Sequence, residues 1–278
     1  MHSSRSESIR APILAILLIE LFSLIARSYL QVELIKIGQP TALAKNLSYL
    51  VVPVIWASMM FPIFKQHRHF LSQRFKLANL TLRTIAIGVL VGILLRIAGW
   101  GQLIGFSALG IYRNDDPNAI IGPLFSFSCP PIETILVTLL VMTLLTPVIE
   151  EVINRGFLLY SFLRKGRLIA IVLSSVLFAV FHTQASIPSA FIAGLFLAVF
   201  ALNSGSLWAP IAAHATHNGL VTLDWICLQV QWSPSETTLK LVGIGVSALL
   251  IGILSLVACS RLVSRECVGT DKLSQRFR

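Results

Sequence analysis

Long apolar runs, separated by short polar connections, dominate the hydrophobic pattern of this chain. Eight of these runs are long enough, or nearly so, to cross a bilayer core as helices. They cover residues 11–30, 47–64, 80–106, 132–149, 168–183, 187–203, 207–225 and 239–258. The fourth run continues to about residue 163, whereas 168–183 and 187–203 fall short of the ~20 residues that a span usually needs. The pattern predicts an all-α, polytopic membrane protein with about eight transmembrane helices.

Composition supports the same class. Of the 278 residues, 55% are hydrophobic and only 12% are charged, whereas a soluble domain has about 25% charged residues. No repeat, low-complexity linker or change of composition divides the chain, so a single membrane domain is expected over 1–278. The net charge of +10 comes from basic residues in short clusters between the apolar runs. Such clusters are typical of topology signals, so we expect a lipid bilayer as partner and no nucleic acid.

The distribution of Lys and Arg predicts the orientation. With the N-terminus inside, fourteen basic residues lie on the inner side and five on the outer side. The outer five are Arg27, Lys36, Lys45, Arg113 and Lys240. The positive-inside rule therefore predicts a multi-pass protein of the plasma (inner) membrane with both termini cytoplasmic. Basic residues precede the first run, as in a signal peptide, but this run is interpreted as an uncleaved first span.

Four cysteines are too few and too scattered for a metal-binding framework, and no CxxC pair occurs. Cys129 and Cys227 both fall on the outer side in this topology, where a disulfide between them could persist. The alternative is that both are free thiols packed against apolar side chains.

Charged residues interrupt the fourth run in an unusual way. Glu150, Glu151 and Arg155 lie within six residues of one another in a strongly apolar segment, where each ionised group costs about 2.5–3.5 kcal/mol or more. On a helix, Glu151 and Arg155 are four residues apart and can form an ion pair, while Glu150 points about 100° away. One carboxylate is thus expected to be anchored and the other to be free. The alternative is an ion pair that only fixes helix packing.

Two later runs carry further polar groups. His182 ends the fifth run, one helical turn after Phe178, and His214 and Asn218 share one face of the seventh. At the helical rise of ~1.5 Å per residue, Glu150, His182 and Asn218 all lie roughly 18–22 Å from the inner boundary, and His214 roughly 12 Å. Polar groups from three helices at similar depth favour one common site. This depth also predicts a cleft that opens outward, or laterally into the outer leaflet.

Three motifs in this order resemble the CPBP family of intramembrane endopeptidases, which includes type II CAAX prenyl proteases and bacteriocin-processing proteins. They are Glu150-Glu151-xxx-Arg155, Phe178-xxx-His182 and His214-xxx-Asn218, within a core of about residues 130–225. Asn154 departs from the family, which more often carries an aromatic residue before the arginine. At this position it could hydrogen-bond Glu150, four residues earlier.

The resemblance implies a protease of membrane-associated or exported peptides, with catalytic residues Glu150, Glu151, Arg155, His182, His214 and Asn218. Glu150 would take a proton from water that His182 orients, and His214 with Asn218 would stabilise the oxyanion. Glu151 and Arg155 would hold the helix in place. No cofactor is expected, although a zinc-dependent version remains an alternative because carboxylates and histidines also bind zinc. A non-enzymatic transporter or immunity protein on a protease-like core is the rival from another class.

Overall fold

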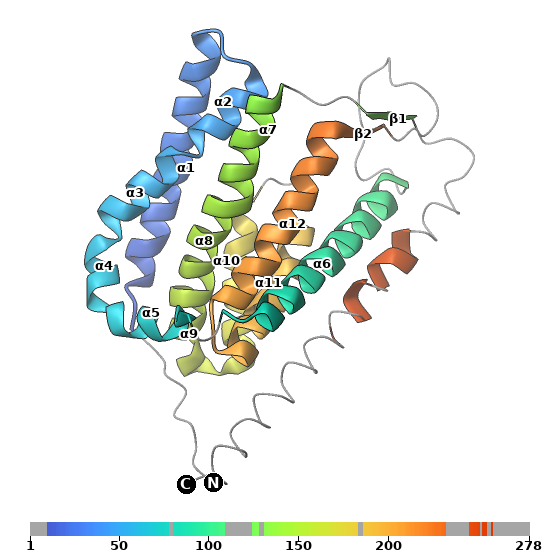
Figure 1. Ribbon diagram of the computed structural model, residues 1–278. Coiled ribbons are helices and arrows are strands. Elements are labelled where there is room, and N and C mark those ends of the chain that lie inside the picture. Colours follow the sequence, from blue (N-terminus) through green and yellow to red (C-terminus); the bar gives the residue numbers. More distant parts are fainter. Residues whose placement is uncertain are drawn as a thin grey trace.

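Helices make up almost all of the described chain (Figure 1). The computed structural model describes residues 10–77, 80–108, 124–127, 131–182, 186–231, 245–250, 252–254 and 257. The first half contains α1 (Ile13–Lys36), α2 (Thr41–Ser48), α3 (Val51–Met59), α4 (Phe61–Gln66), α5 (Arg68–Arg74) and α6 (Leu82–Ala108). β1 (Leu124–Phe127) pairs antiparallel with β2 (Leu228–Gln231) as a short ribbon. Apart from this ribbon, the expected all-α architecture is confirmed.

The second half begins with one continuous helical rod, Ile132–Lys165. Its pieces are α7 (Ile132–Thr138), the π-helical η2 (Leu139–Leu145), α8 (Thr146–Glu151), the π-helical η3 (Val152–Leu158), α9 (Leu159–Phe162) and the 3₁₀ turn η4 (Leu163–Lys165). Gly166 follows with φ of +110°, a conformation that side chains disfavour, and reverses the chain. The helices α10 (Arg167–Val180), α11 (Ile187–Ser204) and α12 (Trp208–Cys227) complete the bundle.

Four helical stretches of the described residues are long and apolar enough to cross a membrane. They are Ile13–Lys36, Leu82–Gln102, Ile132–Lys165 and Ile187–Ser204, with Arg167–Val180 and Gly245–Leu254 as shorter apolar helices. A multi-pass membrane protein is therefore confirmed, but the count of eight spans is not. Large apolar side chains such as Leu14, Leu18 and Phe22 are exposed on α1, as expected for a face that contacts lipid.

The expected span 47–64 is wrong as a single helix. The chain instead forms α2, α3 and α4 beside α1, with breaks at Tyr49–Leu50 and at Met60 (Figure 1). Pro53 and Pro62 each lie in the first turn of the helix that follows a break. A proline fits there because it has no N–H, and for the same reason it cannot extend the preceding turn. The first break places Tyr49 beside α1.

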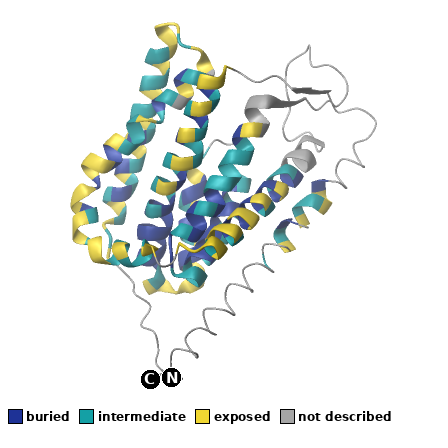
Figure 2. Cartoon of the chain, viewed as in Figure 1, coloured by how far each residue is buried: buried dark blue, intermediate teal, exposed yellow. Residues whose placement is uncertain are grey.

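Close packing fixes α12, which carries two of the motif residues, against α6. A Cβ atom on Gly92 would lie only 2.5 Å from the Ala213 carbonyl oxygen, so a larger residue would push the helices apart. Buried residues gather where the rod, α11 and α12 meet, and exposed residues follow the outer faces of α1 and α3–α5 (Figure 2). The motif region is therefore held in the interior of the bundle.

Candidate functional site

A buried network joins the rod to α12. The Glu151 and Arg155 side chains are fully buried, and the Arg155 Nη1 donates to Glu151 Oε1 over 3.0 Å. The same Glu151 oxygen lies 2.8 Å from His214 Nδ1. The Arg155 Nη2 donates to the Gly194 carbonyl of α11 over 3.3 Å. The expected Glu151–Arg155 pair therefore forms, and it connects three helices.

Glu150 points away from this pair, as its helical position predicted. Its Oε2 lies 3.7 Å from His214 Nε2, and 27% of its side chain is exposed. That oxygen has no hydrogen-bond partner. His214 thus lies between the two carboxylates, with one ring nitrogen facing each. Because Glu151 holds Nδ1 of the His214 ring, Nε2 of the same ring keeps its direction towards Glu150.

Phe178 is the contact point between the second motif and the others. Its ring centroid lies 4.6 Å from that of His182 and 5.6 Å from that of His214. The Arg155 guanidinium stacks on the same ring at 4.3 Å, an arrangement that stabilises a buried cation. The Nδ1 atom of His182 bonds the Phe178 carbonyl over 2.8 Å. No hydrogen bond or ion pair joins His182 to Glu150 in the described structure. The expected sharing of a water molecule by these two residues therefore stays a prediction.

Both asparagines of the motifs bond backbone carbonyls. Asn218 donates from Nδ2 to the Met142 carbonyl over 2.9 Å. That carbonyl lies in η2, five residues before Pro147, which has no N–H for a π-type bond. Asn154 donates to the Glu150 carbonyl over 2.8 Å. The predicted Asn154–Glu150 bond therefore forms, but to the backbone. These side chains stabilise the π-helical segments on either side of the Glu150–Glu151 pair, and such segments are frequent at functional sites.

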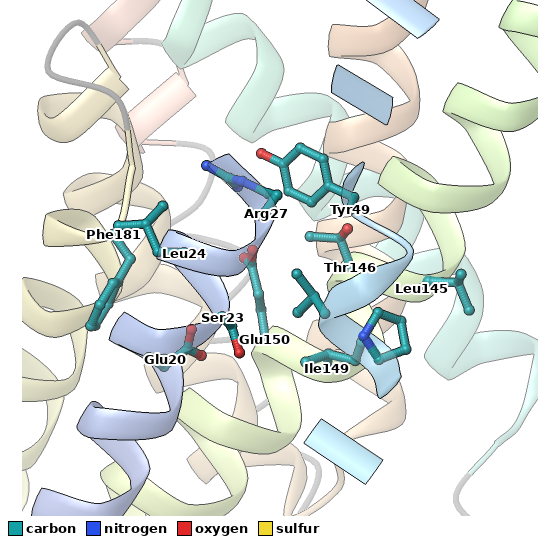
Figure 3. Close-up of a pocket in the computed structure, with 12 residues that line it drawn as sticks. Glu20, Ser23, Leu24, Arg27, Tyr49, Leu145, Thr146, Ile149, Glu150 and Phe181 are labelled. Atoms are coloured by element: carbon teal, nitrogen blue, oxygen red, sulfur yellow. The ribbon is translucent and has the colours of Figure 1, made fainter. Parts of the chain in front are cut away.

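Glu150 opens onto a cavity that the sequence interpretation did not include (Figure 3). The cavity has a volume of about 60 Å³. Its polar wall includes Glu20, Ser23 and Arg27 from α1, and Tyr49 from the break before α3. Arg27, assigned to the outer side above, lies within α1 and stacks on the Tyr49 ring at 4.3 Å. Glu20 is the only acidic residue in the first apolar run, and that isolation was the signal available for finding it.

The donor groups offer few ligands for a metal. Among the described residues, no group of three or more His, Cys, Asp or Glu side chains is arranged to hold an ion. His214 already uses Nδ1 on Glu151, which leaves its Nε2 and the Glu150 carboxylate as the neighbouring donors. A catalytic zinc ion usually takes three protein ligands. The alternatives for Cys129 and Cys227, a disulfide or two free thiols, lie outside the described residues, because Cys129 is not among them.

Residues 132–220 match the family model described as Rce1-like, type II CAAX prenyl endopeptidase. This region lies within the core 130–225 that the motifs predicted, and it contains all six candidate residues. The match supports the resemblance of this region to the CPBP/CAAX protease family. A comparison with curated proteins found no match for the chain. The match to this protease family implies intramembrane protease activity and favours it over a transporter. The α1 wall of the cavity lies outside the matched CAAX protease-like region.

Proposed function

We propose that this CAAX protease-like protein is a glutamate-dependent intramembrane endopeptidase. It hydrolyses a peptide bond of a membrane-associated or exported peptide with water that Glu150 activates. The observation that carries the proposal is the Glu150 carboxylate, which has an unpartnered oxygen and opens onto a cavity beside a fixed histidine. A half-buried carboxylate that lines a cavity able to hold water is suited to act as a general base. A cavity of this volume has room for more than one water molecule.

His214 is suited to stabilise the oxyanion that forms when water adds to the peptide carbonyl. A carboxylate only accepts hydrogen bonds, so Nδ1 of His214 is the donor to Glu151. When the ring is protonated, Nε2 carries a second N–H, which is directed towards the side where Glu150 lies. Asn218 contributes the N–H that its bond to Met142 leaves unused. Preorganised donors of this kind supply about 3–4 kcal/mol of transition-state stabilisation each.

Glu151 and Arg155 act as positioning residues in this mechanism. Their ion pair fixes the His214 ring through Nδ1 and anchors the rod to α11 through the Gly194 carbonyl. His182 is assigned the orientation of the attacking water, since the Phe178 carbonyl holds its Nδ1 and no described residue bonds its Nε2. Glu151 and Arg155 as positioning residues, and His182 as the residue that orients water, can act without contact with the peptide.

The glutamate mechanism predicts that activity does not depend on zinc. The test uses purified protein in lipid vesicles and a library of membrane-anchored peptides, with products identified by mass spectrometry. Protein treated with a chelator is expected to cleave at the same rate as untreated protein, because the donor set around Glu150 is too small for a zinc site. Activity that disappears with chelator and returns with zinc would contradict this mechanism and support the metal-dependent alternative.

The depth of the site and the charge bias predict entry from the outer side. In a chain without native cysteines, single cysteines at Thr183 and Asp224 are expected to react with an impermeant thiol reagent added to intact cells. A cysteine at Lys165 is expected not to react, because Lys165 belongs to an inner basic cluster. Labelling in the opposite pattern would invert the proposed topology, in which both termini are cytoplasmic, and would move the substrate to the inner face.

A further inference from the structure

The proposed reaction needs a proton for the leaving amine as well as a base for water. An amide nitrogen leaves only after protonation, so a proton donor on the amine side of the scissile bond lowers the barrier. Glu150 could serve both steps by returning the proton that it takes from water. A second acid in the same cavity would separate the two tasks, and the structure contains a candidate.

Glu20 shares the cavity with Glu150 from the opposite helix. It projects from α1, whereas Glu150 projects from α8, and both line the same cavity (Figure 3). The Glu20 carboxyl forms no hydrogen bond or ion pair with any described residue. Because it lines the cavity, water or a peptide there can contact it. Because both carboxyls line one cavity, each raises the cost of a negative charge on the other.

The described residues that line the cavity include two acidic side chains and one basic side chain. Glu20 and Glu150 are its acidic residues, and Arg27 is the only basic residue that lines it among the described residues. Arg27 is half-buried and held on the Tyr49 ring, so it offers one positive charge from a fixed position. Two neighbouring carboxyls in an apolar setting avoid a double negative charge by keeping one proton between them. The pair is thus provided with one base and one acid.

We propose that Glu20 is a second catalytic carboxyl of this protein and donates the proton to the leaving amine; this rests on the proposed glutamate mechanism. Glu150 takes a proton from water while the hydroxide adds to the carbonyl carbon. Glu20 then gives its proton to the amide nitrogen as the C–N bond breaks, which releases a neutral amine and a carboxylic acid. The proton on Glu150 returns to Glu20 through cavity water and restores both groups. The active site therefore extends to α1, beyond the matched region.

The test compares two leaving groups at the same bond. A library peptide that the wild-type protein cleaves is resynthesised with a thioester in place of the scissile amide. A thiolate leaves without a proton because the pKa of a thiol is about 8.5. The pKa at which a neutral amine loses a proton is far higher, so an amine anion is a much poorer leaving group. Glu20→Gln is expected to slow amide cleavage by about 10²–10⁴-fold and to leave thioester cleavage within about threefold of wild type, since no proton donor is needed there.

Controls separate this role from a structural one. Glu33→Gln, at a partly exposed position of α1 paired with Lys36, is expected to leave both rates unchanged. A second variant, Glu20→Ala, is expected to recover amide cleavage when formate buffer is added at a pH low enough to keep part of it as formic acid, which then donates the proton. The proposal is overturned if Glu20→Gln keeps the ratio of amide to thioester rates at the wild-type value and formate restores nothing in Glu20→Ala. Unimpaired amide cleavage by Glu150→Gln, or no cleavage by wild type, overturns the underlying mechanism instead.

Discussion

Glu150→Gln is expected to abolish peptide cleavage while the protein stays folded in the membrane. Glutamine has nearly the same shape but cannot take a proton from water, so a loss of about 10²–10⁴-fold or more is expected. The fold should tolerate the change because the Glu150 carboxylate is partly exposed to the cavity and Oε2 has no hydrogen bond to lose. Cleavage of the peptide library by protein in lipid vesicles measures the effect. The inactive variant should also retain peptides for identification.

Three further variants test whether the loss of activity in Glu150→Gln is specific to the proposed site. Glu133→Gln changes an exposed carboxylate at the start of the same rod and is expected to keep wild-type activity. His214→Ala removes the ring nitrogen that faces Glu150 and is expected to be inactive. His182→Ala is expected to be inactive if this residue orients the water. Wild-type activity in any variant of Glu150, His182 or His214 would remove that residue from the mechanism.

Arg155→Met is expected to cause the largest loss of stability. The substitution leaves the Glu151 carboxylate buried without its cation, and it removes the bond to the Gly194 carbonyl and the stacking on Phe178. Breaking one side of a buried pair typically costs about 3–5 kcal/mol of unfolding free energy. Denaturant unfolding of the protein in detergent micelles measures the change. Arg167→Met, at an exposed site bonded to Asn203, is the matched control and should change stability by less than about 1 kcal/mol.

The double variant Glu151→Met with Arg155→Met separates stability from activity. Replacement of a whole buried ion pair by apolar side chains is often neutral or stabilising, so most of the lost stability is expected to return. Activity is expected to stay lost, because His214 no longer has a carboxylate partner for Nδ1. A double variant that is stable and fully active would show that the pair has no positioning role. A double variant as unstable as Arg155→Met alone would contradict the electrostatic explanation.

Local sequence spacing was sufficient for the contacts within single helices. Residues four apart share a helix face, so the Glu151–Arg155 pair and the direction of Glu150 away from it followed from the sequence. The apolar composition predicted the membrane class, and the ordered motifs predicted the family core that matches over 132–220. The broken span 47–64 was missed, although Pro53 and Pro62 were visible. A hydropathy window sums apolar character over a run and does not register a missing N–H.

Thus the sequence by itself determined the class of the protein, its resemblance to a protease family and the residues that carry charge within the membrane. Only the tertiary structure decided which of those residues meet. It placed His214 between Glu150 and Glu151, used Asn218 to bond the Met142 carbonyl, and left His182 without a direct contact to Glu150. It also brought Glu20 and Arg27 of α1 to the Glu150 cavity, more than a hundred residues away along the chain. Helical periodicity fixes neighbours on one helix, whereas contacts between helices depend on how side-chain volumes pack, as at Gly92 against Ala213.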